Sequence, residues 1–302
     1  MKEENKKISG KKNRKIAEKI LSINQETILN LDTLYDVEKF GDDIQKIWDN
    51  REVQNFYFSS GFRGEDNFEH YLNSIERISQ LRYIPSNFDL LSSRIKTIGI
   101  AEENYIFKDF KITTIDVGGT RNERRKWIHT YPNTCGIIYT ISLLDISRFL
   151  YEDKKVLRID DSILLFETTI NNQNLKHLPF VILFSCVDLL ERELRYFDIS
   201  TNHFFKNFKG NRFNILEVSE FVKDKFFEKI ENFKEKNLNY YFIDLLDTEM
   251  VKQLLGSILG QTQVNVDSRK ISYRSLNRKN PDLFRYSFKK FIDLQIICNH
   301  HE

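Results

Sequence analysis

The residues best suited to chemistry lie at 116–120, where the sequence reads Asp-Val-Gly-Gly-Thr. An apolar stretch precedes Asp116, so we expect a strand that ends in this carboxylate and turns through two glycines. At the carboxyl edge of a sheet, a carboxylate can hold the water shell of a metal ion, and glycine lets backbone N–H groups approach an anion closely. The segment therefore favours a metal-assisted phosphate site. Taken alone, an Asp-x-Gly-Gly turn is a weak signal, because it is usually just a turn.

Strands and helices alternate around this turn. The pattern predicts a tight hairpin with strands at 105–107 and 110–116. Three short apolar strands, of the kind buried on both faces, are expected at 136–144, 179–184 and 240–246. Helices are expected at 121–129, 145–169, 218–233 and 248–259. This alternation predicts an α/β domain with a mainly parallel sheet.

The chain before this domain has a different pattern. Apolar residues recur at helical spacing over 15–31, 42–56 and 67–81, and Pro85 stops the last of these stretches. We expect four ranges: a polar basic tail at 1–14, a helical region at 15–88, the α/β domain at 89–260, and a basic tail at 261–302. Within the last range, residues 283–297 are predicted to form one more helix.

The composition limits the kind of function. Lys and Arg number 46 against 44 Asp and Glu, a formal charge of +2, so no global charge argument favours nucleic acid or an anionic membrane. The three cysteines lie far apart without a C-x-x-C pair, which argues against a disulfide framework or a cysteine-based zinc site. No signal peptide and no apolar run long enough to span a bilayer is found, so we expect a soluble intracellular protein without a transmembrane segment.

The longer string from Asp116 to Ile128, DVGGTRNERRKWI, is far more specific than its first four residues. It resembles the switch II segment of heterotrimeric G protein alpha subunits almost residue for residue. The string from Leu91 to Ile100, which follows Tyr83-Ile84-Pro85, is similar to switch I of the same family. The resemblance extends over roughly residues 15–260. It implies a Ras-like GTPase-type sheet preceded by a shortened all-α helical domain.

The resemblance also implies roles for individual residues. Arg94 would be an arginine finger, supplied in cis, that stabilises charge on the transferring phosphoryl group. Thr97 would ligate Mg²⁺ through its hydroxyl, and Asp116 would hold the water shell of the metal. Gly119 would donate its backbone N–H to the γ-phosphate of GTP. Asp188 would accept hydrogen bonds from the guanine edge, although a carboxylate at the end of a strand could equally cap the next helix.

A wider set of residues would surround the bound GTP or GDP. It consists of Leu91, Ser92, Ser93, Arg94, Ile95, Lys96, Thr97, Asp116, Val117, Gly118, Gly119, Thr120, Ser185, Cys186, Val187, Asp188 and Leu245. A second set would contact the beta-gamma dimer, and further partners would be a receptor or an effector. This second set is Arg121, Arg124, Arg125, Lys126 and Trp127. A solvated helix side with one buried tryptophan is the competing interpretation of it. Nucleic acid is not expected as a partner.

The sequence departs from the family in four ways. No G-x-x-x-x-G-K-[ST] phosphate loop occurs in the 302 residues, and the nearest fragment, Ser9–Lys12, has no apolar strand before it. Thr120 replaces the catalytic glutamine, and its hydroxyl is too short to orient water as a glutamine amide does, so hydrolysis should be slow. The guanine-reading Asn-Lys-x-Asp has become Ser185–Asp188, and the Thr-Cys-Ala-Thr loop has become Ile243–Leu246. Three lost charge-assisted contacts would weaken binding by about 5–9 kcal/mol, on the order of 10³- to 10⁶-fold.

The first departure also affects the sheet. In this family the first strand, which runs into the phosphate loop, lies at the centre of the sheet, between the strands that here end at Asp116 and begin at Gly136. Residues 1–14 are too charged to replace it. We therefore expect those two strands either to pair directly or to leave a cleft. Unpaired buried backbone groups are costly, so the isolated chain should be poorly stable.

Together these features predict a G-protein-alpha-like modulator or transducer of receptor-coupled transmembrane signalling. It would act through residues 116–130, with guanine-nucleotide binding weakened or lost. Two alternatives stay open: a genuine GTP-binding, slowly hydrolysing GTPase, and a non-functional truncated fragment. We expect a cytoplasmic protein, held at the inner face of the plasma membrane through partners. Lys2 in place of glycine excludes N-myristoylation, and no other lipidation motif is found at the N-terminus.

Overall fold

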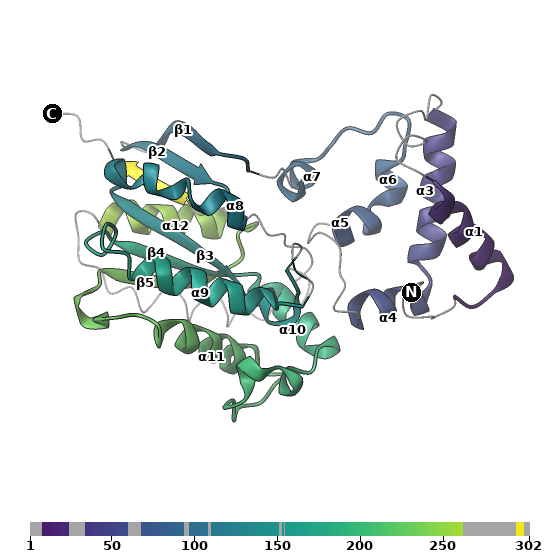
Figure 1. Cartoon of the computed structure of the whole chain (residues 1–302). Helices are drawn as coiled ribbons and strands as arrows, with labels where there is room; N and C mark the ends of the chain where they lie inside the picture. The colour runs from purple at the N-terminus through teal and green to yellow at the C-terminus, as the bar shows by residue number, and fades with distance from the viewer. Residues whose placement is uncertain are drawn as a thin grey trace. The chain divides into compact units, whose positions relative to one another are not determined.

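The computed structural model describes residues 8–23, 34–59, 68–93, 97–107, 110–150, 153, 155–261 and 294–298. The chain separates into two compact units, Met1–Arg94 and Ile95–Glu302. Each unit has its own set of secondary-structure elements (Figure 1).

The first unit is helical. Its helices are α1 (Lys11–Ser22), α3 (Leu34–Trp48), α4 (Arg51–Ser59), α5 (Phe68–Asn73), α6 (Ile75–Ile78) and α7 (Asn87–Ser92). The basic tail predicted for residues 1–14 ends earlier than expected, because α1 begins at Lys11. Residues 24–31, the second half of the first predicted helix, lie outside the described residues.

The single helix predicted over 42–56 is wrong, because the helix is interrupted between α3, which ends at Trp48, and α4, which begins at Arg51. The Asn50 side-chain oxygen accepts a hydrogen bond of 2.9 Å from the backbone N–H of Glu52, so this residue caps the new helix. The helix predicted over 67–81 is likewise divided at Ser74. Trp48 at the end of α3 is buried and donates from Nε1 to Asn73 Oδ1 at 2.6 Å, which ties α3 to α5.

The second unit contains a six-stranded sheet. Its strands are β1 (Ile100–Phe107), β2 (Phe110–Val117), β3 (Gly136–Ser142), β4 (Phe180–Ser185), β5 (Leu238–Ile243) and β6 (Leu294–Cys298). The spatial order is β1-β2-β6-β3-β4-β5. The predicted hairpin is confirmed as the antiparallel pair β1–β2. The three predicted apolar strands are confirmed as β3, β4 and β5, which run parallel to one another.

Helices cover both faces of this sheet (Figure 1). They are α8 (Arg121–Arg124), α9 (Arg158–Ile170), α10 (Val187–Tyr196), α11 (Ile215–Phe227) and α12 (Thr248–Gln261), with short 3₁₀ turns between them. Alternate strand residues enter two separate cores, as the period of two in a strand requires. Tyr139 and Phe184 pack with Phe166 of α9 and Phe226 of α11, whereas Ile138 packs with the residues around Leu254 of α12.

Two of the predicted helices of this unit are much shorter than the sequence pattern indicated. The stretch 121–129 forms only the single turn α8 before a 3₁₀ turn at Trp127–His129. The stretch 145–169 begins as a 3₁₀ turn over Leu143–Ser147, and its α-helix α9 starts only at Arg158. The helices predicted at 218–233 and 248–259 are found as α11 and α12.

Both alternatives predicted for the centre of the sheet are wrong. The strand ending near Asp116 neither pairs directly with the strand from Gly136 nor leaves a cleft, because β6 lies between them and pairs antiparallel with each. The helix predicted over 283–297 is also wrong for residues 294–297, which belong to β6. Its other residues lie outside the described part of the chain.

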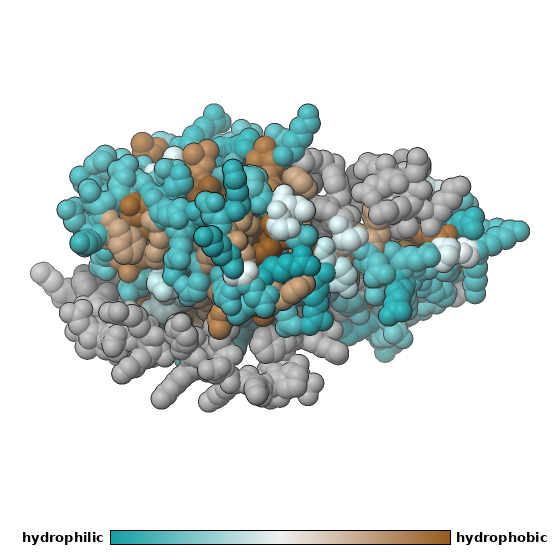
Figure 2. Space-filling model, turned by 90° about the horizontal axis from the view of Figure 1, so that it is seen from below, coloured by the Kyte–Doolittle hydropathy of each residue, from teal (hydrophilic) through white to brown (hydrophobic). Residues whose placement is uncertain are grey.

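The surface seen in Figure 2 is mainly hydrophilic, with apolar residues in several separate groups. Individual large side chains are nevertheless well exposed, among them Ile84, Ile98, Ile106 and Ile128. Among the described helices, none combines the length and the apolar character needed to cross a bilayer.

Candidate functional site

The Asp-x-Gly-Gly turn stands at the carboxyl end of β2, as predicted. Thr97 Oγ1 donates a hydrogen bond of 2.9 Å to Asp116 Oδ2, so the predicted metal ligand and the predicted metal-shell carboxylate lie together. The other carboxylate oxygen, Asp116 Oδ1, is buried and has no hydrogen-bond partner among the described residues. A buried carboxylate oxygen without a donor is costly. This oxygen therefore points to a group that the described residues do not supply.

A hard cation fits the oxygen pair of Thr97 and Asp116. Mg²⁺ prefers oxygen ligands and commonly takes only one or two carboxylates from the protein, with water and phosphate oxygens completing its shell. Within the described residues, no group of three or more His, Cys, Asp or Glu side chains could hold a metal ion without such help. Both residues named in the prediction are therefore chemically suited to Mg²⁺.

The two glycines of the turn have opposite surroundings. A Cβ added at Gly118 would lie 2.7 Å from Glu123 Cγ and 2.9 Å from the Thr97 carbonyl oxygen, so the turn requires glycine there. A Cβ added at Gly119 would meet nothing within 4 Å. The open side of the turn, where a ligand has room to approach, is therefore at Gly119. Val117 is buried at the end of β2.

Glu123 of α8 links the segment after the turn to Gly99, the residue just before β1. Its Oε2 accepts hydrogen bonds from the backbone N–H of Gly99 at 2.7 Å and from Lys126 Nζ at 2.6 Å. Thr120 is the N-cap residue of α8, yet its side chain makes no capping hydrogen bond. The sequence analysis missed Glu123, although Thr120-x-x-Glu123 is the spacing of a capping box.

Two arginines of α8 converge on one carboxylate of α9. Arg121 donates to Asp161 Oδ1 at 3.1 and 2.9 Å, and Arg124 donates to Asp161 Oδ2. Arg124 also donates from Nε to the Gly119 carbonyl oxygen at 3.0 Å. Burial acts to raise the pKa of Asp161, but the hydrogen bonds from Arg124 and Arg121 outweigh it and hold the pKa below its usual value. Asp161 was missed because it lies far from the turn in sequence.

The remaining residues of the predicted partner set divide between the interior and the surface. Trp127 is 5% exposed, and its Nε1 donates to the Gly118 carbonyl oxygen at 2.9 Å. Lys126 is half-buried beside Glu123. Arg125 is exposed, and so is Ile128, which follows the predicted set and is 56% exposed. Trp127 and Lys126 thus fix this segment through contacts with its neighbours, while Arg125 and Ile128 leave a basic and apolar surface exposed.

The predicted guanine-reading loop lies at the carboxyl ends of β4 and β5. Ser185 and Cys186 are buried against the end of β3, where Ser185 Oγ donates to the Ile141 carbonyl oxygen at 3.3 Å. Cys186, in a left-handed conformation, is the N-cap residue of α10, so the alternative that Asp188 caps this helix is wrong. Val187 and Asp188 form the first turn of α10, where a negative charge is favourable.

Leu245, the last residue of the predicted nucleotide set, follows β5. Its side chain is partly buried and packs with the apolar cluster of Ile243 and Leu254. Its side chain therefore contributes to packing beside α12.

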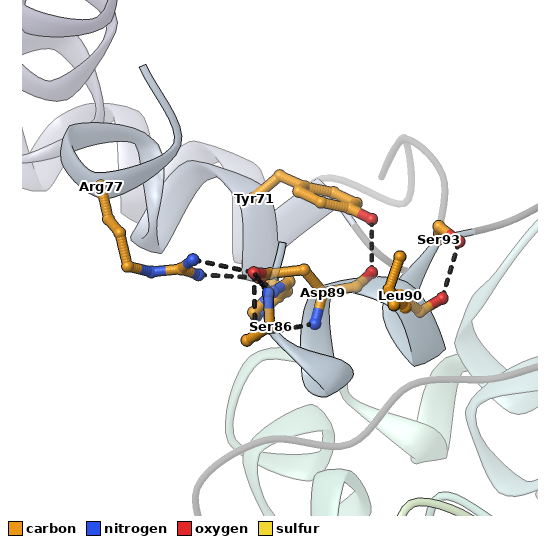
Figure 3. Close-up of polar contacts among 7 residues, drawn as sticks. Tyr71, Arg77, Ser86, Asp89, Leu90 and Ser93 are labelled. Atoms are coloured by element: carbon orange, nitrogen blue, oxygen red, sulfur yellow. Dashed lines mark hydrogen bonds and ion pairs between the residues drawn. The ribbon is translucent and has the colours of Figure 1, made fainter. Parts of the chain in front are cut away.

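Three predicted residues of the switch I string lie in the first unit, at the end of α7. Leu91 and Ser93 are exposed, whereas Ser92 is buried. Ser93 Oγ donates to the Leu90 carbonyl oxygen at 2.7 Å (Figure 3). Arg94, Ile95 and Lys96, including the predicted arginine finger, lie outside the described residues.

The helix that carries these residues is anchored by Asp89, which is 3% exposed. Arg77 donates to both carboxylate oxygens of Asp89, at 2.8 and 2.7 Å, and Ser86 donates from its backbone and its hydroxyl (Figure 3). His70 Nε2 lies 2.7 Å from Asp89 Oδ1, and the Tyr71 hydroxyl donates to the Asp89 carbonyl oxygen. The Arg77 hydrogen bonds are the main reason why the pKa of Asp89 lies far below its usual range.

The sheet is mixed rather than mainly parallel as predicted, because β1 and β6 pair antiparallel with their neighbours and only β3, β4 and β5 pair parallel. A helical unit followed by such a sheet, with helices on both faces, is compatible with a Ras-like α/β protein, and the Asp116–Thr120 turn stands at the expected strand end. The chain belongs to the G-protein alpha subunit family, whose model matches residues 1–262.

Three curated relatives illustrate this similarity. The alpha-12 subunit of Dictyostelium discoideum is 30% identical over 227 residues, which cover 74% of this chain and 63% of that protein. The alpha-4 subunit of Caenorhabditis briggsae is 30% identical over 224 residues, or 73% and 61%. The alpha-1 subunit of Caenorhabditis elegans is 30% identical over 217 residues, or 72% and 60%. All three are described as guanine nucleotide-binding proteins. The chain spans about three fifths of the length of these relatives.

Proposed function

We propose that the protein is an alpha-subunit-like transducer of receptor-coupled signalling that binds a beta-gamma dimer or an effector through residues 116–130. The contacts of Arg124 carry this proposal. This one side chain connects the Gly119 carbonyl, in the turn, to Asp161, in α9. Switch segments of GTPases are commonly ordered by the γ-phosphate and Mg²⁺. Here contacts from within the protein hold α8, and they support partner binding that does not require nucleotide.

The partner would contact the outer side of the segment. Arg121 keeps about half of its side chain exposed while paired with Asp161, and Arg125 and Ile128 are exposed beside it. Arginine together with an exposed apolar side chain is a composition enriched in protein interfaces. We place the protein in the cytoplasm, with its partner as the link to the inner face of the plasma membrane.

Placing a negative charge on this outer side tests the proposal. Arg125→Glu and Ile128→Asp should each weaken capture by an immobilised beta-gamma dimer by about tenfold or more, the effect of an interface residue worth about 1.4 kcal/mol. Both side chains are exposed, so neither change should alter the melting temperature. Lys209→Glu, an exposed charge reversal outside the segment, is the matched control. Equal capture by all four proteins would contradict the proposed surface.

We further propose that guanine-nucleotide binding is weak in this chain. The lack of a phosphate-loop motif, and the changes at Thr120, Ser185–Val187 and Leu245, support this part of the proposal. We also propose that the protein is coupled to a receptor and that its two domains span residues 15–88 and 89–260.

A second candidate function, slow GTP hydrolysis, is favoured by one specific observation. Asp116 Oδ1 is buried without a hydrogen-bond partner among the described residues, beside the Thr97 hydroxyl. Mg²⁺ bound there would neutralise charge on the phosphates of GTP. Thr97 and Asp116 would hold the ion, and the Gly119 N–H would approach the phosphate from the open side of the turn. Gly119→Ala tests this candidate, because its Cβ meets nothing in the free protein. The change should reduce nucleotide affinity without altering stability only if phosphate binds there.

A further inference from the structure

The central strand of the sheet comes from far along the chain. β6 lies between β2 and β3, and 32 residues (262–293) separate it from α12. Strand β2 runs in the same direction as β3, since β6 is antiparallel to both. Because β6 is the only strand between β2 and β3 in the described sheet, removing it would divide the sheet into two parts, the β1–β2 hairpin and the parallel strands β3, β4 and β5.

The pairing of β6 with its neighbours is short. Its five residues pair with Ile112–Asp116 of β2, but only Leu294, Gln295 and Ile296 pair with β3, at Gly136–Ile138. On its other side, β3 pairs with β4 over six residues. Within the described residues, the carboxyl half of β3 has no strand partner on the β6 side. Few backbone hydrogen bonds thus hold the strand on which the continuity of the sheet depends.

The two strands beside this position, β2 and β3, need a third strand between them. Ile112 and Ile115 of β2 and Ile137 and Ile138 of β3 are all buried, so the backbone beside them lies in the interior. Buried backbone N–H and C=O groups without partners are costly. An extended segment satisfies them through its own main chain, and strand addition of this kind makes few demands on sequence beyond apolar side chains.

We propose that the position between β2 and β3 is a strand-binding groove, and that Leu294–Cys298 of the same chain is its detachable occupant. Because this segment belongs to the same chain, it binds the groove in an intramolecular step and competes with any free peptide. It therefore excludes free peptides until it is weakened or displaced. This inference does not depend on nucleotide or beta-gamma binding.

A disulfide between β2 and β6 tests the register. Ile112 and Cys298 are directly opposite each other, and opposite residues of antiparallel strands share a face with Cα atoms about 4.5–5.5 Å apart, which a disulfide can span. In a Cys135→Ser background, Ile112→Cys should form an intramolecular bond with the natural Cys298 under mild oxidation by diamide. Thr113→Cys is the matched control, because adjacent residues of a strand face opposite sides. Peptide mapping would identify the bond.

Three results would overturn the proposal: no bond between the Ile112→Cys position and Cys298, equal bonding in the Thr113→Cys control, or a bond found only between two copies of the chain. Because Ile112 is a core residue, the pair Thr114→Cys and Ile296→Cys, also directly opposite, provides a second test of the same register.

A peptide tests whether the occupant is detachable. Ile296→Pro in the full chain removes a backbone donor from the centre of β6 and should open the groove. A fluorescent peptide of residues 292–300 should then bind this variant about tenfold more tightly, or better, than the wild type, whose tethered strand competes. Equal affinity for both proteins would overturn the proposal. If the variant does not fold, the disulfide tests still decide whether β6 occupies the groove.

Discussion

Arg124 and Asp161 form an ion pair between α8 and α9, with the arginine also bound to the Gly119 carbonyl oxygen. Three parts of the molecule therefore meet at one guanidinium: the glycine turn, the short helix after it and the first turn of α9. The same carboxylate accepts hydrogen bonds from Arg121. This arrangement fixes the inner side of the segment that we propose to bind a partner, and it leaves Arg125 and Ile128 exposed.

Asp161→Asn should destabilise the protein by about 1.5–3 kcal/mol, the usual contribution of a charge-assisted hydrogen bond, because Arg124 is then left without its carboxylate. Urea unfolding measures the change. The neighbouring variant Asp160→Asn is the control, since Asp160 pairs with His203 at the exposed surface and such pairs contribute about 0–1 kcal/mol. Equal effects of the two substitutions would show that α8 is not held by Asp161.

The Asp89 network predicts a specific dependence of stability on pH. Its hydrogen bonds hold the pKa of Asp89 below the ordinary value of 3.8, so its contribution is complete above that pH and is lost as the pH falls below it. The difference in unfolding free energy between wild type and Asp89→Asn should be constant from about pH 7 to pH 5 and shrink below about pH 4. A difference that stays constant to about pH 2.5 would contradict this ionised, buried state.

The two glycines of the turn should respond differently to alanine. Gly118→Ala should cost about 1–3 kcal/mol, because its Cβ would overlap with Glu123 and the Thr97 carbonyl. Gly119→Ala should change stability by about 0.5 kcal/mol or less, since its Cβ enters open space. Thermal unfolding of both variants measures this contrast. Similar melting temperatures for the two variants would contradict the finding that Gly118 is crowded and Gly119 is open.

The sequence predicted the parts of the fold that local patterns determine. Continuous apolar runs located β3 and β4 within two residues of their ends, because strands buried on both faces have few polar positions. Asp116 and Thr97 were predicted to act at one site, and they share a hydrogen bond.

Contacts between distant segments could not be predicted in this way. β6 was predicted as part of a helix, because a short apolar run fits either structure and only its pairing partners, β2 and β3, decide the outcome. Asp161 was missed for a similar reason, since it lies 37 positions after Arg124 in the sequence. The break between α3 and α4 depends on one side chain, Asn50, whose capping role overrides the helical spacing around it.

Thermal unfolding with added nucleotide separates the three functional alternatives. With about 0.1 mM GDP or a non-hydrolysable GTP analogue and Mg²⁺, we expect a shift below about 1 °C, because a dissociation constant near about 1 mM leaves most of the protein free. ATP is the control. A guanine-specific rise of several degrees would instead favour the GTPase. The lack of a cooperative transition would favour the truncated-fragment alternative.

The most direct test of the proposed function is the affinity for a beta-gamma dimer, measured with GDP, with a GTP analogue and without nucleotide. The contacts of Arg124 with Gly119 and Asp161 hold the proposed surface from within the protein. We therefore predict capture in all three conditions, with dissociation constants that agree within about twofold, or about 0.4 kcal/mol. Capture that requires GDP and is lost with the GTP analogue, or no capture at all, would contradict the account.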